Sequence, residues 1–418
     1  MTNRWCLMKF VSFVSLITIV GSVYGLQAPT VSGLLPTELA RPLLEQDPRV
    51  AAARAGLAVA REESSILDMS PYEWTAKATG QRRSLDTGAQ YREWNVGVER
   101  AIRLPRKGVA DRDMGKATLE EAHARYGEAM HESAKTLMTL WIDWLGAERG
   151  RELAAANFQA VQANLWAVDK RNRAGDASRL DLNLASAELA EQKRMNNDAQ
   201  TQAAAAWTRL SVRFPGIQPL RLALPLPLLL TEDASQWRHR ILAESDVLKI
   251  AQTQLRMAQA QADRALANRF ADPTLGIFSA SEVGGRERLT GLSISIPLAG
   301  GLRDSKSAKA LAAVEVARQS VEITQRELET EIATDVVTAR GLYESLQMAN
   351  EGARAMQENA KLVQRAYALG EGDLQSLLLA RRQATASENS ALQAQVGALK
   401  AFYGLLTDAH FIWDLEHD

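Results

Sequence analysis

Alternation of apolar and polar residues predicts a strand at about residues 288–298, and a helical pattern follows almost at once. Between Leu292 and Leu298 every second residue is apolar, and the residues between them are serine or proline, which is the period of a strand with one apolar face. Gly300 and Gly301 supply a flexible joint, and from about residue 302 apolar residues recur at the spacing of one helix face. A strand therefore leads almost directly into a very long helix.

The same order of elements occurs earlier in the chain. An alternating segment at about 72–82 is separated by a turn-rich loop from a second one at about 91–103, and two such segments predict a β-hairpin. A helical hairpin is expected after it, at about 106–211. In the second half, strands at about 274–282 and 288–298 precede a helical hairpin at about 302–406.

Both helical hairpins are predicted to be unusually long. The first arm has about 65 residues, from about Arg106 to Arg171, and at about 1.5 Å per residue it would make a rod of roughly 100 Å. Gly146 and Gly150 are expected to break or bend this arm. Gly175 turns the chain at its end, and Gly370 does the same in the second hairpin.

Matched spacings indicate two copies of one unit. Gly97 and Gly291 are 194 positions apart, and Gly175 and Gly370 are 195 apart, so helices of equal length follow the two strand pairs. The proline-rich residues 214–231 cannot form a continuous helix and are interpreted as a linker. A single helix is then expected from about residue 232 to Ala265. The predicted division is a first repeat at 26–213, this linker, a second repeat at 232–407 and a short tail at 408–418.

Residues 1–25 have the pattern of a secretory signal. Arg4 and Lys9 precede a short apolar run, and cleavage after Gly25 fits the small residues at its exit. An uncleaved membrane anchor is the alternative, but the run is short for a membrane span. The only cysteine, Cys6, would leave with the signal, so the exported chain is expected to carry no disulfide.

Candidate chemistry is sparse. The net charge is −1, which gives no basic field for nucleic acid, and no phosphate loop, nucleophile elbow or HExxH pattern occurs. His123 and His131 are eight residues apart and lack the spacing of a zinc site. The tail could bind a divalent ion weakly, although solvated side chains are the simpler interpretation; its candidate ligands are His410, Asp414, Glu416, His417 and Asp418. We therefore expect no catalysis, no cofactor and no resident metal.

The four strands have the length of strands that cross an outer membrane when tilted. Four strands with bare edges cannot lie in lipid, where every backbone group has to be paired, so several copies of the chain are expected to close the sheet together. The apolar face would meet lipid and the polar face water. Aromatic residues are expected at the membrane interfaces: Tyr72, Trp74, Tyr91, Trp94 and Phe278. The alternatives are a soluble sheet packed on helices and a periplasmic coiled-coil scaffold without membrane insertion.

The order helix, strand, strand and long helical hairpin, repeated twice, resembles the TolC-like outer-membrane efflux factors over nearly all of the mature chain. The two hairpin turns, Gly175 to Ala185 and Gly370 to Ala380, and the strand-to-helix junctions carry the resemblance with this order. It implies a mainly α-helical fold with a membrane β-barrel: a homotrimer with twelve strands, four from each chain, above a periplasmic tunnel of helices. It also implies a periplasmic adaptor and an inner-membrane pump of the resistance–nodulation–division type as partners, outer-membrane lipid around the barrel, and no enzyme activity.

The compact length and the Leu-Pro-Arg-Lys-Gly junction at 104–108 are most similar to the heavy-metal branch of that family. Its members serve pumps for cobalt, zinc and cadmium or for nickel and cobalt. The resemblance therefore implies a passive exit duct for divalent heavy-metal cations, with an organic drug or a secreted protein as the alternative cargo.

In the family, the hairpin turns form the periplasmic entrance, where acidic rings and polar links between helices govern closure. Asp181 matches the acidic position after the first turn glycine, whereas Ser376 stands where an acidic residue is common and Gly372 replaces a basic one. Acidic side chains at this mouth would suit cations, and helix capping is the alternative role for them. The entrance and adaptor contact is accordingly expected at Gly175, Asp176, Asp181, Gly370, Glu371, Gly372, Asp373 and Ser376.

Overall fold

The structure, a computed structural model, describes residues 33–220, 222–298 and 300–413. The expected signal at 1–25 and the candidate tail ligands from Asp414 to Asp418 lie outside these ranges. The helices are α1 (Thr37–Glu45), α2 (Pro48–Asp68), α3 (Pro105–Arg173), α4 (Arg179–Arg213), α5 (Ala234–Glu244), α6 (Asp246–Ala267), α7 (Gly301–Leu369) and α8 (Leu374–Asp408). The strands are β1 (Thr75–Ser84), β2 (Gln90–Ala101), β3 (Thr274–Glu282) and β4 (Glu287–Ser295), with a 3₁₀ turn, η1 (Val283–Gly285), between the last two.

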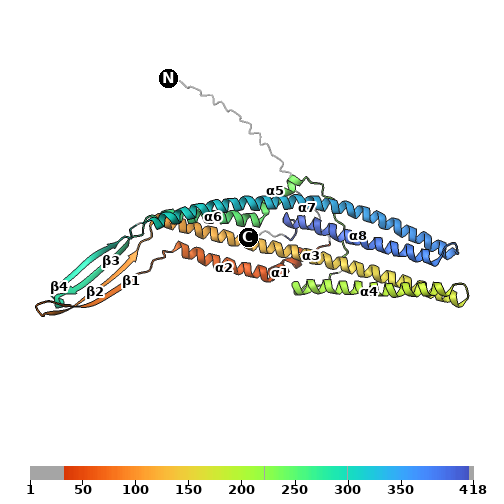
Figure 1. Cartoon of the computed structure of the whole chain (residues 1–418), viewed down its shortest axis with the longest axis horizontal. Helices are drawn as coiled ribbons and strands as arrows, with labels where there is room; N and C mark the ends of the chain where they lie inside the picture. The colour runs from red at the N-terminus through yellow and green to blue at the C-terminus, as the bar shows by residue number, and fades with distance from the viewer. Residues whose placement is uncertain (1–32, 221, 299, 414–418) are drawn as a thin grey trace, which may run out of the picture.

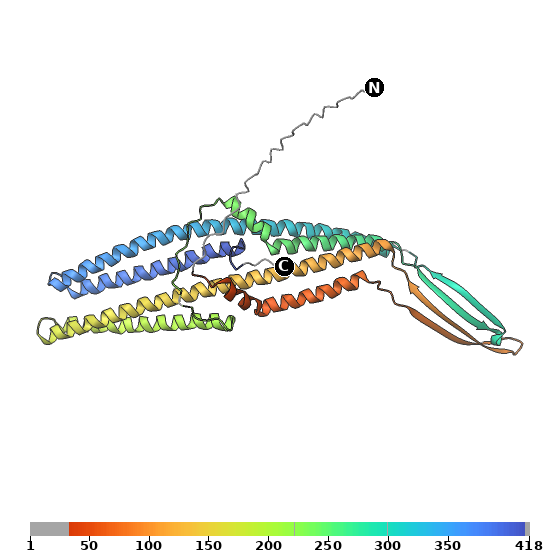
Figure 2. The same cartoon turned by 180° about the vertical axis from the view of Figure 1, so that it is seen from behind.

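The molecule is long and narrow, with the sheet at one end and the two helical turns at the other (Figure 1). α3 and α7 run along nearly the whole helical part. α2 and α6 lie beside their sheet-side portions, and α4 and α8 beside their turn-side portions (Figures 1 and 2). The duplication is confirmed, because α3 and α7 each have 69 residues and α4 and α8 each have 35.

Local chemistry explains where several helices begin. Pro48 and Pro105 stand at the first helical positions of α2 and α3, where the fixed φ of proline suits a helix and its missing N–H leaves no bond unmade. Ser178 caps α4, and its side chain accepts a hydrogen bond from the backbone of Asp181. In the part of the chain that the structure describes, no helix is both long and apolar enough to cross a membrane.

The main apolar core lies midway along the helices, where α1, the linker and the end of α8 meet α3. Trp141 is fully buried, and its indole N–H donates a hydrogen bond to the carbonyl of Gly33 at 2.8 Å. Trp413 donates in the same way to the carbonyl of Leu35 at 2.7 Å. Buried tryptophans whose N–H groups are satisfied therefore tie the start of the described chain to the centre of α3 and its end to that same start.

The sheet has the order β1-β2-β3-β4 and is antiparallel throughout. Each repeat contributes one hairpin, and the two hairpins join through β2 and β3, where Gly97 pairs with Phe278. β1 and β4 are the two free edges of this sheet.

Several strand boundaries differ from the expected ones, and hydrogen bonding explains the differences. β1 begins at Thr75 rather than near residue 72, because the Tyr72 hydroxyl is held outside the sheet by Asp272 at 2.5 Å. β2 ends at Ala101, since the backbone N–H of Leu104 already donates to Asp272 at 3.0 Å. β4 ends at Ser295, before Pro297, which has no N–H to continue a ladder.

Two helix predictions are wrong. The helix expected from residue 232 to Ala265 is two helices, because Ser245 has non-helical backbone angles (φ −58°, ψ 113°) and caps α6 by accepting a hydrogen bond from the backbone of Leu248. α3 continues through Gly146 and Gly150 without a break. Gly146 instead permits a close helix contact, since a Cβ there would lie 2.5 Å from Cγ2 of Val396 on α8.

Candidate functional site

The turn between α3 and α4 is held by its own backbone. Gly175 has φ +85°, a left-handed conformation that glycine adopts without strain. The backbone N–H of Asp176 donates to the carbonyl of Arg171 at 2.9 Å, and the Asn172 side chain donates to the carbonyl of Ala177 at 2.8 Å. The turn expected at Gly175 is therefore present and fully formed within one chain.

Asp181 is engaged in helix capping. Its carboxylate accepts hydrogen bonds from the backbone N–H of Ser178 at 3.0 Å and from the Ser178 hydroxyl at 2.8 Å. This reciprocal arrangement satisfies free N–H groups at the start of α4. The side chain of Asp181 thus has a local structural role in addition to any role at an entrance.

The turn between α7 and α8 also has a glycine of positive φ and a hydrogen-bonded pair of aspartate and serine, with the two residues in the opposite order. Gly370 has φ +81°, and the Asp373 carboxylate accepts from the backbone N–H of Ser376 at 2.7 Å and from the Ser376 hydroxyl at 2.9 Å. These hydrogen bonds stabilise the charged form and hold the pKa of Asp373 below its usual value. Ser376, which replaces an acidic residue of the family pattern, serves as the partner of this cap.

The structure brings the two turns together at one end of the molecule (Figure 1). A small apolar cluster joins the four helices next to them, and its buried members are Val168, Ala185, Leu374, Leu377 and Leu378. The guanidinium of Arg171 lies over the ring of Tyr367, 5.3 Å from its centroid. The candidate entrance residues of the two repeats therefore form a single surface.

An ion pair between a buried glutamate and a half-exposed arginine links α4 to α8 behind that surface. Glu188, whose side chain is 2% exposed, lies 2.5 Å from Nη2 of Arg382 and also accepts from the Gln192 side chain at 3.0 Å. Arg381, on the same turn of α8, has a buried guanidinium nitrogen without a hydrogen-bond partner. Burial lowers the pKa of Arg381. Sequence reasoning missed this link, because its two arms are 194 residues apart and neither belongs to a turn motif.

The tip is not an acidic ring in the isolated chain. Asp176, Glu371 and Asp373 are exposed, but basic side chains surround them. Arginine and lysine outnumber aspartate and glutamate in residues 169–181, and also in residues 365–382.

The strand register divides the sheet into one apolar and one polar face. Val98, Ile277 and Leu292 pair across the strands on the apolar face, and Leu292 is 83% exposed. In the neighbouring row, Lys77, Gly97, Phe278 and Gly291 pair on the polar face.

The expected interface aromatics fall on both faces of the sheet. Trp94 lies on the apolar face, and Trp74 lies next to that face, with the Arg100 guanidinium 5.6 Å from its ring centroid. Tyr91 and Phe278 share the polar face, where a Cβ at Gly291 would lie 2.7 Å from the Phe278 ring. The two tryptophans are thus at positions that could contact lipid, and Tyr91 and Phe278 are on the opposite side.

Charges are also segregated between the two faces. The register assigns six charged residues to the polar face, namely Lys77, Arg83, Glu93, Glu99, Glu282 and Glu287, for a net charge of −2. The apolar face carries four charged residues, all of them arginine: Arg82, Arg92, Arg100 and Arg288. The polar face therefore has a net negative charge, whereas every charged side chain on the apolar face is basic.

His131 and His410 come together midway along the molecule, although they are far apart in sequence. Their ring centroids are 5.5 Å apart, and the Asp408 carboxylate lies 3.0 Å from Nε2 of His131 and 2.9 Å from Nζ of Lys135. Burial opposes the charge on Asp408, but His131 and Lys135 outweigh it and keep its pKa below the usual value. Within the described ranges, no group of three or more His, Cys, Asp or Glu side chains could hold a metal ion.

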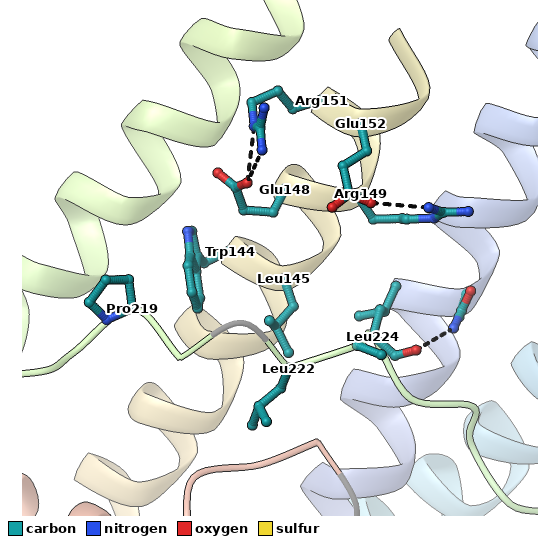
Figure 3. A pocket seen from close by; sticks show the side chains of 11 residues that line it. Trp144, Leu145, Glu148, Arg149, Arg151, Glu152, Pro219, Leu222 and Leu224 are labelled. Atoms are coloured by element: carbon teal, nitrogen blue, oxygen red, sulfur yellow. Dashed lines mark hydrogen bonds and ion pairs between the residues drawn. The ribbon is translucent and has the colours of Figure 1, made fainter. Parts of the chain in front are cut away.

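A cavity of about 700 Å³ lies between α3, α8 and the linker (Figure 3). Trp144, Leu145 and Leu224 supply apolar walls, and Glu148 lies 2.8 Å from Nη2 of Arg151 on the rim. The side chains lining it include no pair of nucleophile and base. The cavity is consistent with a linker that crosses the helices and gives no support to catalysis.

Comparison with known proteins gives a consistent picture. Residues 39–212 match the family described as outer membrane efflux protein, while comparison with curated proteins found no match. The fold is similar to a membrane protein from Pseudomonas aeruginosa (TM-score 0.73, 18% identity, 91% of each chain). It is also similar to the outer membrane protein VceC from Vibrio cholerae (TM-score 0.72, 15% identity, 89% of this chain and 95% of that one). The open state of the MtrE outer membrane channel of Neisseria gonorrhoeae is a third relative in fold (TM-score 0.66, 20% identity, 89% and 88%).

The family match covers the first repeat, and the shared fold extends over both repeats. Residues 39–212 therefore match the outer membrane efflux protein family in sequence, and both repeats together have the fold of solved outer membrane proteins and channels.

Proposed function

We propose that three copies of this chain form the exit duct of a tripartite efflux system and that its cargo is divalent heavy-metal cations. An inner-membrane pump of the resistance–nodulation–division type supplies the energy, and a periplasmic adaptor joins the pump to the duct. The observation that carries the cation assignment is the acidic polar face of the sheet. The support for the assembly does not depend on the cargo, whereas the cargo assignment rests on the lumen that the assembly forms.

The trimer is supported by the open edges of the sheet. β1 and β4 have unpaired backbone groups along one side, and these groups cannot remain unpaired in lipid. Three four-stranded sheets close into a barrel of twelve strands when β4 of each copy pairs with β1 of the next. The exposed apolar face then contacts lipid, and the polar face lines the lumen.

The position of the membrane is supported by the two tryptophans. Trp94 lies near the hairpin end of β2, and Trp74 is level with Arg100, six residues further along that strand. Six residues of strand span about 20 Å, close to the height of the apolar band of an outer-membrane barrel. Trp74 and Trp94 therefore serve as the interfacial aromatics on the two sides of the membrane.

The cation cargo is supported by the net charge of −2 on the polar face of each copy. Three copies would line the lumen with a net charge of −6. An acidic lumen raises the local concentration of cations and excludes anions. The sequence similarity to the heavy-metal branch at residues 104–108 points to the same cargo.

Contact with the adaptor is assigned to the two helical turns. Besides the eight candidate residues there, large apolar side chains are exposed next to the turns, among them Leu180, Leu369 and Leu379. An exposed apolar patch with a polar rim is typical of a protein interface. The adaptor's helical tips would cover these leucines and contact Asp176 and Glu371 at the rim.

The test is metal accumulation in cells that lack this protein, with nickel, cobalt, zinc and cadmium compared side by side. We expect at least one of these ions to accumulate more than in the parent strain, and the chain supplied in trans to reverse the change. If no metal accumulates and organic compounds accumulate instead, the cargo assignment is wrong while the duct is retained. If neither accumulates, the role in efflux is wrong.

A further inference from the structure

Three arginines project from the apolar face of the sheet at its hairpin end. Arg82 of β1 and Arg92 of β2 are directly paired across the strands, and Arg288 of β4 lies at the level of Trp94. All three side chains are exposed. This outer arginine cluster, Arg82, Arg92 and Arg288, faces the same side as Val96, Ile277 and Leu292 and therefore faces away from the lumen.

The chain itself does not neutralise this cluster. Arg83, the next residue after Arg82, points to the polar face and pairs there with Glu93 at 3.0 Å and Glu282 at 3.4 Å. Arg82, Arg92 and Arg288 have no such carboxylate partner in the described part of the chain. Like charges directly opposite each other destabilise a sheet, and arginine on a lipid-facing strand is unfavourable unless it lies near an interface.

The cluster lies at the outer surface of the membrane. In the proposed duct the helices lie on the periplasmic side, so the β-hairpin turns at 85–89 and 283–286, at the opposite end of the molecule, point out of the cell. Arg82 and Arg92 lie beyond Trp94 in that direction, so they are above the interfacial tryptophan rather than within the apolar band. The opposite end of this face has one arginine, Arg100, which already contacts Trp74 and donates to the carbonyl of Tyr72 at 2.9 Å.

We propose that Arg82, Arg92 and Arg288 bind the phosphate groups of the glycolipid in the outer leaflet, the phosphorylated disaccharide of lipopolysaccharide. The guanidinium fork matches phosphate oxygens in a bidentate manner. Phosphate supplies the anion that the protein omits, and it relieves the repulsion between Arg82 and Arg92. The acyl chains of the same lipid lie against Trp94, Val96 and Leu292 directly below.

Closure of the barrel would make the site continuous, and this extension rests on the proposed trimer. When β4 of one copy pairs with β1 of the next, Arg288 comes near the neighbouring copy's Arg82. Nine arginines then form a belt around the outer rim. The site within one copy needs only the pairing of Arg82 with Arg92, which is present in the single chain.

The test uses the full-length exported protein purified in detergent and titrated with bisphosphorylated lipid A or with lipid A stripped of phosphate. Native mass spectrometry measures the bound lipid and the oligomeric state in one spectrum. We expect the bisphosphorylated form to bind about tenfold or more tightly than the phosphate-free form. The triple variant R82Q/R92Q/R288Q should lose this preference, and the control R61Q/R209Q/R238Q, which removes the same charge from exposed positions on α2, α4 and α5, should keep it.

Equal binding of the two lipids to the wild-type protein would overturn the proposal. It would also be overturned if the triple variant kept the preference for the phosphorylated lipid, or if the control variant lost that preference to the same extent. The wild-type comparison decides the matter even if the triple variant does not fold. A wild-type protein that is monomeric but still prefers the phosphorylated lipid would refute the trimer and support the arginine site. A wild-type protein that is trimeric but does not prefer the phosphorylated lipid would support the trimer and refute the arginine site.

Discussion

Lys107 Nζ lies 2.9 Å from Asp272 Oδ1, and each side chain is only 4% exposed. The same carboxylate accepts from the backbone N–H of Leu104 and from the Tyr72 hydroxyl. One aspartate of the second repeat thus holds the start of α3 and the lead into β1, both from the first repeat. The pair therefore ties the two repeats together where the strands meet the helices, since β1, α3 and β3 all begin within three residues of Asp272 or one of its partners. Figure 2 shows this junction between the sheet and the helices.

Breaking this pair is expected to be costly. K107M leaves a buried carboxylate without its counter-ion, and D272A leaves a buried ammonium, so each should lower the free energy of unfolding by about 3–5 kcal/mol. The loss in free energy of unfolding in the double variant K107M/D272L should be smaller than the sum of the losses in the two single variants. Thermal melts followed by circular dichroism measure all three. K116M, at an exposed position on α3, is the control and should change stability by no more than about 0.5 kcal/mol; a K107M melt equal to that of K116M would contradict the role of the pair.

The repeated fold could be predicted because its signals are local and periodic. Alternation in β4, the spacing of apolar residues along α7 and the glycines at 175 and 370 each depend on neighbouring residues only. Two copies of each signal then fixed the order and length of the elements. The resemblance to a known family added the placement of the sheet and the helices relative to the membrane.

Contacts between distant segments could not be predicted in the same way. Glu188 and Arg382, or His131 and His410, meet only because α3, α4 and α8 pack side by side. Gly146 illustrates the error that follows: a glycine within a helix suggests a break when the neighbouring helix is unknown. By contrast, once the structure gave the strand register, the alternation of side chains along each strand assigned every charged residue to one face of the sheet.

Gly146 and Gly150 provide a matched test of this helix contact. A Cβ at position 146 would lie 2.5 Å from Val396, whereas at position 150 the nearest atom, on Leu392, is 3.6 Å away. Alanine improves helix propensity at both positions by about 1 kcal/mol, but crowding at 146 costs about 1–3 kcal/mol. We expect G150A to raise the melting temperature and G146A to lower it, with V396A restoring part of the loss in G146A. If both glycine variants are stabilised, the close contact with α8 is not required.

Asp47 should make the protein sensitive to acid. Its carboxylate is buried and accepts hydrogen bonds from the backbone of Arg49 and from Ser133, both at 2.8 Å, and it pairs with Arg213. Burial opposes the charge on Asp47, but Arg213 and these donors outweigh it and place its pKa below the usual 3.8. Such a group stabilises the fold above the unfolded pKa, and that contribution disappears as the pH falls through the lower folded value.

D47N should therefore lower the free energy of unfolding by about 2 kcal/mol at neutral pH, where the carboxylate of the wild type is charged and accepts all its hydrogen bonds. Below about pH 4 the stability of D47N should fall less steeply than that of the wild type. The Asp47 carboxylate of the wild type takes up a proton when the chain unfolds in acid, and the amide in D47N does not. Urea unfolding at pH 7, 4 and 3 measures the difference. S133A retains the carboxylate but removes one of its donors, so its loss in free energy of unfolding should lie between zero and that of D47N. Parallel pH profiles of stability for the wild type and D47N would contradict the role of Asp47 in acid sensitivity.

The Glu188–Arg382 link offers a test of the entrance. E188A removes a buried carboxylate that joins α4 to α8, and it leaves Arg382 and Gln192 without their acceptor. We expect the tip to loosen, so that large antibiotics normally excluded by the outer membrane enter cells and the channel conducts more in planar bilayers. E191Q, which alters an exposed pair with Arg194 on the same helix, is the matched control. Unchanged permeability in E188A, with the protein still in the outer membrane, would mean that this pair does not restrain the opening.

The acidic lumen of the proposed trimer predicts selectivity for cations. Glu99, which lies 2.6 Å from Lys77, and Glu287 are two of the four glutamates on the polar face of each sheet. In a salt gradient across a planar bilayer the wild-type channel should show a reversal potential of cationic sign. E99Q/E287Q changes the net charge of this face from −2 to zero and should move the potential toward zero, while R82Q, on the outer face, should leave it unchanged. A wild-type channel without preference for cations would remove the charge argument for a metal cargo, because the lumen would then not concentrate the ions that the pump delivers.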